Sequence, residues 1–261
     1  MIENVSPKKF LGQHFLIDEN ISKKIVNSFS LKEFDNIVEI GPGKGALTKY
    51  LFEYSDKLIL VEYDTESVEY IKSSFKIHNP NIIKQDFLKY NLKDVLSQTS
   101  KNLIIGNFPY NISSQIIFKI LENYLLVDNL VGMFQKEVAE RIISKPNSKE
   151  YGIISVKTQL LYDVKILFDV SPNVFFPKPR VNSSVISMTK KKNVNINFDV
   201  KLFDRLVKLS FQQRRKKIKN SLKKLDINEN ILEDSIFGLR PEQLSVNDFI
   251  RLTQKITNET I

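Results

Sequence analysis

The chain has 261 residues, of which 42% are hydrophobic and 26% charged, an ordinary composition for a globular protein. It contains no cysteine, which excludes disulfides, thiolate metal sites, iron–sulfur clusters and a cysteine nucleophile. Its only histidines are His14 and His78, so we expect no histidine-rich metal site and predict no bound metal. His78 stands in a polar stretch before Pro80 and is expected to be an exposed loop residue.

The termini and the charge distribution bear on location and partners. The first nine residues lack the apolar stretch of a secretory signal, and no window approaches the roughly 18 apolar residues of a membrane span. We therefore expect a cytoplasmic protein. Residues 201–224 hold ten Lys or Arg against one acid, which accounts for the whole net charge of +9. This concentration favours nucleic acid as a partner, with a membrane second and a merely solvated helix face as the alternative.

Short apolar runs alternate with helical patterns over the first 190 residues. Helices are predicted at 46–53, 113–124 and 138–143. Strands are predicted at 36–40, 57–61, 81–84, 102–105 and 130–134. This alternation predicts parallel pairing and a doubly wound α/β sheet. Residues 165–170 and 184–188 are expected to add an antiparallel edge.

The rhythm of strands and helices breaks at the tripeptide 190–192 and the Asn-rich residues 193–197. Beyond them only helices are predicted, at 198–211, 215–225 and 246–256. We therefore place a domain boundary near residue 190. It separates a large α/β domain of residues 1–190 from a small all-helical domain of residues 191–261.

A glycine-rich loop, Gly41-Pro42-Gly43-Lys44-Gly45, joins the first predicted strand of this series to the helix after it. Glycines in such a turn let the backbone pass close to a ligand. The spacing Gly-x-Gly-x-Gly differs from the Gly-x-Gly-x-x-Gly loop that seats a pyrophosphate against a helix N-terminus. S-adenosylmethionine has no phosphate to place there. The loop therefore favours S-adenosylmethionine over a nicotinamide dinucleotide, although a simple tight turn has the same composition.

Two acids follow the next strands of the predicted sheet. Glu62 ends the second strand, 21 residues after Gly41, where a carboxylate can accept hydrogen bonds from ribose hydroxyls. Asp86 follows the third strand, a position suited to the adenine amino group. Because the carboxyl ends of parallel strands meet at one edge, the loop and both acids predict a nucleoside-binding crevice.

The tetrapeptide Asn107-Phe108-Pro109-Tyr110 follows the fourth strand and should face the same crevice. Methylation of adenine N6 is difficult because the amine lone pair is delocalised into the ring. The Asn107 oxygen and a carbonyl of Phe108 or Pro109 could accept the amine protons and favour a pyramidal nitrogen. Pro109 would fix the turn, and Tyr110 would stack on the base, which is worth about 1–3 kcal/mol. We predict that these residues carry the reaction; the alternative is an ordinary Asn-Pro loop.

The sequence resembles the rRNA adenine N6-dimethyltransferase family over nearly its whole length. Four segments carry the resemblance: GQHFL at 12–16, EIGPG at 39–43, GNFPYNIS at 106–113 and FPKPRV at 176–181. The resemblance implies a class I methyltransferase fold, which is Rossmann-like, with a small C-terminal helical domain. It also implies S-adenosylmethionine as the cofactor.

The resemblance further implies individual site residues. S-adenosylmethionine would be bound by His14, Leu16, Gly41, Glu62, Asp86 and Asn107, and we add Gln13 and Gly43 from the same motifs. A second aromatic residue would close the base site opposite Tyr110; Phe175 matches it, and the adjacent Phe176 is the alternative. His14 stands where many relatives have Asn, and Phe108 stands where Leu or Ile is usual.

The family has a branch that dimethylates two adjacent adenines near the 3′ end of small-subunit rRNA and another that modifies large-subunit rRNA and confers macrolide resistance. Segments at 134–141, 148–152, 211–216 and 240–244 resemble the first branch. We expect a monomer that acts on the immature small ribosomal subunit during ribosome maturation. An assembly factor that acts mainly by binding RNA is the other hypothesis. RNA phosphates would be bound by a basic helix with Arg214, Arg215, Lys216, Lys217 and Lys219.

Overall fold

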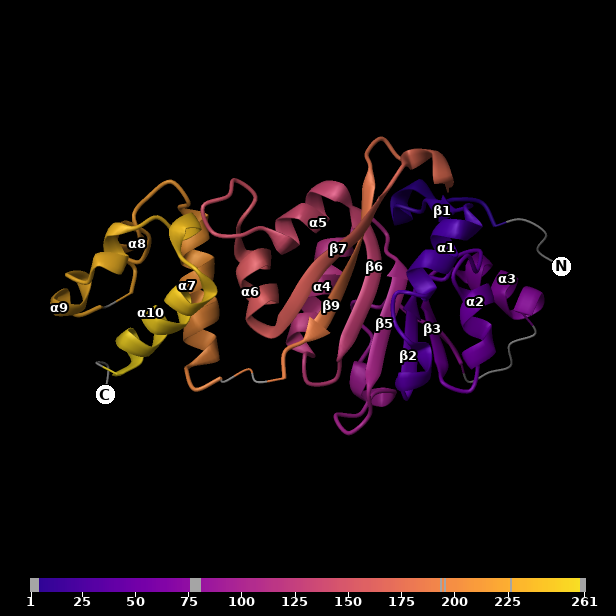
Figure 1. Ribbon diagram of the computed structural model, residues 1–261, viewed down its shortest axis with the longest axis horizontal. Coiled ribbons are helices and arrows are strands. Elements are labelled where there is room, and N and C mark those ends of the chain that lie inside the picture. The colour runs from indigo at the N-terminus through magenta and orange to yellow at the C-terminus, as the bar shows by residue number, and fades with distance from the viewer. Residues whose placement is uncertain (1–4, 76–80, 193, 195, 226, 259–261) are drawn as a thin grey trace. The chain divides into compact units, whose positions relative to one another are not determined.

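The structure is a computed structural model that describes residues 5–75, 81–192, 194, 196–225 and 227–258 (Figure 1). The chain forms two compact units. Unit 1 comprises Met1–Ala139 and Asp163–Lys190, and unit 2 comprises Glu140–Tyr162 and Lys191–Ile261. Residues 140–162 thus group with the C-terminal helices, which corrects the predicted domain of residues 1–190. His78, predicted to be an exposed loop residue, lies outside the described residues.

Unit 1 is built around a seven-stranded sheet with the order β4-β3-β2-β5-β6-β9-β7 (Figure 1). The strands are β2 (Asn36–Ile40), β3 (Leu58–Glu62), β4 (Ile82–Lys84), β5 (Asn102–Asn107), β6 (Asn129–Gln135), β7 (Tyr162–Val170) and β9 (Ser183–Lys190). The pairs from β4 through β6 are parallel, and β9 runs antiparallel to β6. The predicted fold class and the antiparallel addition to the sheet are therefore confirmed.

The helices of unit 1 cover a sheet whose central strands are apolar on both faces. They are α1 (Glu19–Val26), α2 (Thr48–Leu51), α3 (Thr65–Phe75) and α4 (Ser113–Glu122), while α5 (Lys136–Ile143) runs from unit 1 into unit 2. Side chains of α1, α2 and α3 share one core with alternate residues of β2, β3 and β5, among them Ile37, Leu60 and Ile105. A strand buried on both faces needs a continuous apolar run, as Leu103–Ile105 of β5 show.

Short elements complete unit 1. A two-stranded antiparallel sheet pairs β1 (Phe15–Leu16) with β8 (Phe175–Phe176), a pairing that the sequence did not predict. The 3₁₀ helices are η1 (Lys9–Leu11), η2 (Leu31–Glu33), η3 (Phe52–Tyr54), η4 (Leu92–Asp94) and η5 (Pro172–Val174). The helix predicted at 46–53 is shorter than expected, because α2 passes into η3 after one turn.

Unit 2 is helical and has its own hydrophobic core. Its helices are α6 (Ile153–Leu161), α7 (Val200–Gln212), α8 (Ile218–Ser221), α9 (Glu229–Leu232) and α10 (Val246–Asn258), with η6 (Ser235–Gly238) and η7 (Pro241–Gln243). Tyr151 and Val156 join that core together with Phe203 of α7 and Phe249 of α10. This shared core is the physical reason why residues 140–162 belong to unit 2. In the described part of the chain, no helix is long and apolar enough to cross a membrane.

The helix predicted at 215–225 is wrong over most of its length. Helix α7 ends at Gln212, residues 213–217 form a turn that we call the basic loop, and α8 holds only four residues. On a helix, Arg214 and Lys217 would stand three residues apart, a spacing at which like charges destabilise the helix. The loop also allows the buried Ile218 to donate its N–H to the Leu239 carbonyl at 2.8 Å.

Candidate cofactor cavity and catalytic loop

A cavity of about 380 Å³ lies at the carboxyl ends of β2, β3 and β5 in unit 1. Its walls contain all eight residues predicted to bind the cofactor: Gln13, His14, Leu16, Gly41, Gly43, Glu62, Asp86 and Asn107. Pro109 and Tyr110 line it as well. The structure therefore brings together the nucleoside-binding and the catalytic predictions, while the individual contacts with a bound cofactor stay predictions.

Two backbone N–H groups hold the carboxylate of Glu62 in place. One of its carboxylate oxygens accepts the N–H of Gly43 at 3.1 Å, and the other accepts the N–H of Asp64 at 2.8 Å. Burial raises the pKa of Glu62, and these backbone donors oppose that rise. A carboxylate fixed in this way, 6% exposed at the end of β3, can accept hydrogen bonds from a vicinal diol.

Asp86 stands on the other side of the same cavity, after β4. It accepts the N–H of Leu88 at 2.9 Å, and its neighbours Gln85, Phe87 and Leu88 all line the cavity. Phe87 and Leu88 thus add apolar side chains to the cavity wall next to this carboxylate, as a site for an aromatic base requires. The prediction that Asp86 receives the adenine amino group is consistent with this surrounding.

Glu39 is a second buried carboxyl group of the site, and the sequence reasoning did not assign it a role. It lines the cavity from β2, is 2% exposed, and accepts the Thr48 hydroxyl at 2.7 Å. Burial raises the pKa of Glu39 to about 8, with a smaller contribution from the charge of Glu62. The signal for this residue was an acid inside the apolar strand 36–40, directly before the glycine loop.

The side chain of Asn107 is oriented by the N-terminal segment. Its amide nitrogen donates to the His14 carbonyl at 2.9 Å. Because a carbonyl can only accept, this contact fixes the amide with Oδ1 as the acceptor on its other side. His14 is itself fixed, since its Nδ1–H donates to the Pro177 carbonyl at 2.6 Å. The Asn107 oxygen is thus available for the acceptor role predicted for it.

Phe108 anchors residues 107–110, which we call the catalytic loop. It is 1% exposed, and its ring lies over Gly132 of β6, where a Cβ would come within 2.1 Å of the ring. Phe134 packs against the same ring with centroids 5.0 Å apart. The ring of Phe108 is therefore accommodated by a glycine in the neighbouring strand. Because this side chain is packed, it holds the backbone of residues 107–110 in place.

Tyr110 stands half-buried at the cavity wall. Its hydroxyl hydrogen-bonds to Oγ of the fully buried Ser183 at 2.5 Å, and its ring centroid lies 5.2 Å from that of His14. Burial raises the pKa of Tyr110, although the bond to Ser183 opposes this. The ring is thus held at its polar end, and one aromatic wall of a base pocket is present.

The structure does not place Phe175 at that pocket. Phe175 is 3% exposed, belongs to the core of unit 1, and does not line the cavity. Successive residues of a strand point to opposite faces, so Phe176 of β8 is the exposed one, at 59%. Phe176 is also the cross-strand partner of Phe15, which lines the cavity. The role of Phe175 as the second stacking surface therefore stays a prediction, and in this structure its side chain packs in the core of unit 1.

The glycine loop provides space that only a residue without a side chain leaves open. Gly41 has φ of +66°, a conformation that L side chains rarely adopt. A Cβ there would lie 3.8 Å from Pro109, between the two loops that line the cavity. The open backbone, the fixed Glu62 and the apolar walls fit S-adenosylmethionine better than a phosphate-bearing cofactor. Among the described residues, no group of His, Asp and Glu side chains is placed to hold a metal.

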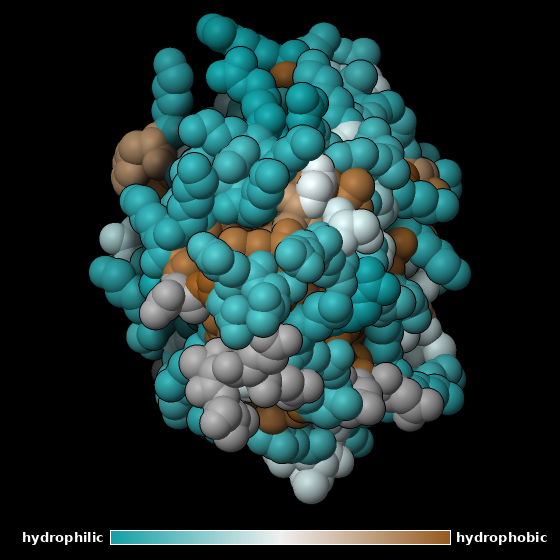
Figure 2. Space-filling view, turned by 90° about the vertical axis from the view of Figure 1, so that its left-hand side faces the viewer, coloured by the Kyte–Doolittle hydropathy of each residue, from teal (hydrophilic) through white to brown (hydrophobic). Residues whose placement is uncertain are grey.

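The basic loop of unit 2 presents its charges unevenly. Arg215, Lys216 and Lys217 are exposed, as is Lys219 of α8, and none of them forms an ion pair within the described residues. Arg214 differs, because it is half-buried and donates to the Ser148 carbonyl at 2.9 Å. Figure 2 shows the surface of unit 2, where hydrophilic residues make up most of the visible area.

Comparisons with known proteins identify the relatives of this chain. A family model described as "Ribosomal RNA adenine dimethylase" matches residues 4–260. A ribosomal RNA small subunit methyltransferase A from Flavobacterium johnsoniae is 52% identical over 98% of this chain and 97% of its own length. The protein of the same name from Cytophaga hutchinsonii is 43% identical over 99% and 100%.

Solved structures confirm the fold. A dimethyladenosine transferase from Plasmodium falciparum superposes with a TM-score of 0.81 at 24% identity, covering 95% of this chain and 99% of that one. The 23S rRNA methyltransferase ErmE gives a TM-score of 0.67 at 21% identity, with coverages of 93% and 99%. With the family match spanning almost every residue, the chain belongs to the ribosomal RNA adenine dimethylase family.

Proposed function

We propose that this enzyme transfers methyl groups from S-adenosylmethionine to N6 of two adjacent adenines near the 3′ end of small-subunit rRNA, in the cytoplasm. Asn107 carries the chemical part of this proposal. Its amide is fixed by the His14 carbonyl so that Oδ1 can accept a proton of the adenine amine. The small-subunit target is supported by relatives named ribosomal RNA small subunit methyltransferase A at 41–52% identity.

The second acceptor is the carbonyl of Phe108. The Pro109 carbonyl already accepts the N–H of Ile112 at 3.2 Å, at the start of α4. Phe108 is rigid because its ring is packed between β5 and β6, so its carbonyl keeps a constant direction. Two acceptors on one amine favour a pyramidal nitrogen, whose lone pair is then localised on the nitrogen instead of delocalised into the ring. Such fixed dipoles cost no reorganisation during the reaction.

The remaining residues position the reactants. Tyr110 stacks on the extruded adenine while Ser183 holds its hydroxyl. Glu62 and Asp86 would hold the ribose and the adenine amine of the cofactor, and the open backbone at Gly41 leaves room for it. When bound, S-adenosylmethionine would supply a methyl group on a positively charged sulfur. No side chain needs to act as a strong base, because alignment and electrostatic fit supply the rate enhancement.

The proposal is tested by mapping the methylated base. Immature small subunits and large-subunit rRNA are incubated separately with the enzyme and an isotopically labelled methyl donor. We expect two labelled methyl groups on each of two neighbouring adenines of the small-subunit rRNA. Label on large-subunit rRNA alone would replace the proposal with the macrolide-resistance type of activity. Maturation that proceeds normally with an Asn107→Ala variant would instead indicate an assembly factor that acts by binding.

A further inference from the structure

The N-terminal segment of residues 5–14 forms one wall of the cofactor cavity, through η1 and the residues after it. Val5 is 1% exposed at its start, and His14 is tied to Pro177 at its end. The part between them lines the cavity with Phe10, which is itself 74% exposed. A wall with so little apolar burial needs polar contacts to stay closed.

Lys8 supplies those contacts from the residue that precedes η1. Its ammonium group forms an ion pair with Asp64, between β3 and α3, and a second one with Glu66 at 3.1 Å. The Asp64 side chain is 3% exposed and also accepts the Ser67 hydroxyl at 2.9 Å. Burial alone would raise the pKa of Asp64, but Lys8 and Ser67 hold it below its usual value. A buried carboxylate of this kind requires its cation.

Gln13 reinforces the same contact. Its Oε1 accepts the backbone N–H of Lys8 at 2.8 Å, and its side chain also helps to lower the pKa of Asp64. Gln13 therefore connects residues 8 and 13 of the N-terminal segment to each other and stabilises their contact with the loop after β3. Gln13 also lines the cavity, and its predicted contact with the cofactor stays a prediction.

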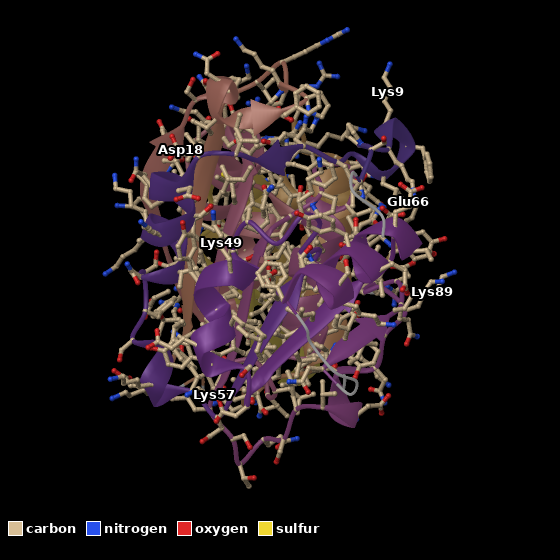
Figure 3. The ribbon with its side chains drawn as sticks, turned by 90° about the vertical axis from the view of Figure 1, so that its right-hand side faces the viewer. Lys9, Asp18, Lys49, Lys57, Glu66 and Lys89 are labelled. Atoms are coloured by element: carbon tan, nitrogen blue, oxygen red, sulfur yellow. The ribbon has the colours of Figure 1, made fainter. Side chains whose placement is uncertain are left out.

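The contact continues into the cofactor site. The backbone N–H of Asp64 donates to Glu62, and Glu62 in turn accepts the N–H of Gly43. A displacement of Lys8 would therefore disturb both the cavity wall and the loop that orients the Glu62 carboxylate, which is predicted to bind the ribose of the cofactor. In Figure 3 the neighbouring Lys9 extends away from Glu66 and from the body of unit 1. Two adjacent lysines thus have different surroundings.

We propose that Lys8 is a positioning residue, which closes the N-terminal segment over the cofactor through Asp64, with Gln13 as a brace. The proposal rests on the proposed function only in taking S-adenosylmethionine as the cofactor. It differs from a merely structural role because it links Lys8 to the affinity for the cofactor. The segment should hold S-adenosylmethionine and its product S-adenosylhomocysteine alike, since both share the nucleoside.

The first test measures S-adenosylhomocysteine binding by calorimetry, without RNA. Lys8→Met keeps the aliphatic stem and removes the charge, and we expect about tenfold weaker binding, the effect of about 1.4 kcal/mol. Lys8→Arg should bind within about threefold of the unaltered chain, because a guanidinium can pair with the same carboxylate. Lys9→Met is the matched control, with unchanged affinity. In methyl transfer, KM for S-adenosylmethionine should rise while kcat changes little.

A spectroscopic test follows the segment itself. The chain contains no tryptophan, so Phe10→Trp places a single reporter on η1. We expect its emission to shift when S-adenosylhomocysteine binds, and this shift to need a higher ligand concentration after Lys8→Met. Asp64→Asn should weaken binding as Lys8→Met does, and the double variant should be no weaker than either, since both remove one contact.

Equal affinity of Lys8→Met and Lys9→Met for S-adenosylhomocysteine would overturn the proposal. So would additive losses in the double variant. Thermal unfolding of the ligand-free variants separates folding from binding: a Lys8→Met protein that melts normally yet binds weakly supports the positioning role. The methyl-mapping experiment is independent of these results, because it can succeed when Lys8 has no role and can fail when Lys8 has one.

Discussion

In unit 1 the functional side chains lie in a cavity where protein groups fix their orientation. In unit 2, by contrast, Arg215, Lys216 and Lys217 of the basic loop are exposed and carry no ion pairs within the described residues. Glu62 and Asn107 each have a hydrogen bond that orients them. Arg215 and Lys216 have none of this kind in the described residues. We therefore expect the reaction to depend on the position of the cavity side chains and RNA binding to depend on the charge density of the basic loop. Substitutions in the cavity should change the rate steeply, and those in the loop should change affinity in a salt-dependent way.

Removing the amide of Asn107 should have the largest effect. We expect Asn107→Ala to lower kcat by at least about 100-fold, the range seen when one preorganised polar group of a transition state is lost. RNA affinity should not change, because the proposed phosphate contacts lie in the basic loop. Single-turnover methylation and RNA binding are measured side by side. A parallel loss of RNA binding would break the division between the two regions.

A substitution that removes no polar group should test whether position itself matters. A Cβ at Gly132 would meet the ring of Phe108, so Gly132→Ala should displace the catalytic loop. We expect kcat to fall by about 10- to 100-fold and stability to fall by about 1–3 kcal/mol. Gly238→Ala is the control, since no atom lies within 4 Å of its Cβ. Wild-type kcat in a folded Gly132→Ala protein would contradict the role of Phe108 as an anchor.

The basic loop should respond to salt. Replacing Arg215, Lys216 and Lys217 by Ala should lessen the slope of log affinity against log salt by about 2–3, because roughly three fewer counterions are released. With a saturating RNA concentration, kcat should stay unchanged. Fluorescence titrations with rRNA at several salt concentrations measure the slope. The control replaces three exposed lysines of unit 1: Lys32, Lys93 and Lys165. An equal change of slope in the control would remove the special role of the loop.

Arg214 sharpens this test, because it lies in the same loop but donates to the Ser148 carbonyl. We expect Arg214→Ala to loosen the contact between the basic loop and residue 148, with a loss of about 1–3 kcal/mol, rather than to lessen the salt slope by one charge. Hydrogen exchange in residues 145–151 would report that loosening. If Arg214→Ala instead lessened the salt slope of RNA binding while hydrogen exchange stayed unchanged, Arg214 would be counted among the residues that contact RNA.

The smallest effect concerns stability and pH. The pKa of Glu39 is raised to about 8, so the folded chain holds a proton that the unfolded chain releases near pH 4. Stability from this group is complete below that lower value and is lost as pH rises toward 8. Glu39→Gln should therefore raise Tm by about 4–8 °C at pH 8 and very little at pH 5, in the ligand-free protein. A gain that is equal at both pH values would rule out this titration.

The sequence by itself determined the parallel sheet and the location of the site. Apolar runs such as 36–40 and 102–105 specify strands buried on both faces, and chain order then places Gly41, Glu62, Asp86 and Asn107 at one edge. These features depend on local pattern and on the direction of parallel strands. Both can be read from residues close together in the chain, so the fold class and the cofactor cavity were predictable.

Only the tertiary structure decided which neighbours each side chain meets. It buried Phe175 and exposed Phe176, because the pairing of β1 with β8 joins segments about 160 residues apart. In the structure, residues 140–162 belong to unit 2, and the predicted basic helix is reduced to the four residues of α8. Lys8 has a carboxylate partner that Lys9 lacks in the described residues. Contacts between distant residues depend on packing, which no periodicity in the chain encodes. That is why the site could be located from the sequence but the contacts that hold it could not.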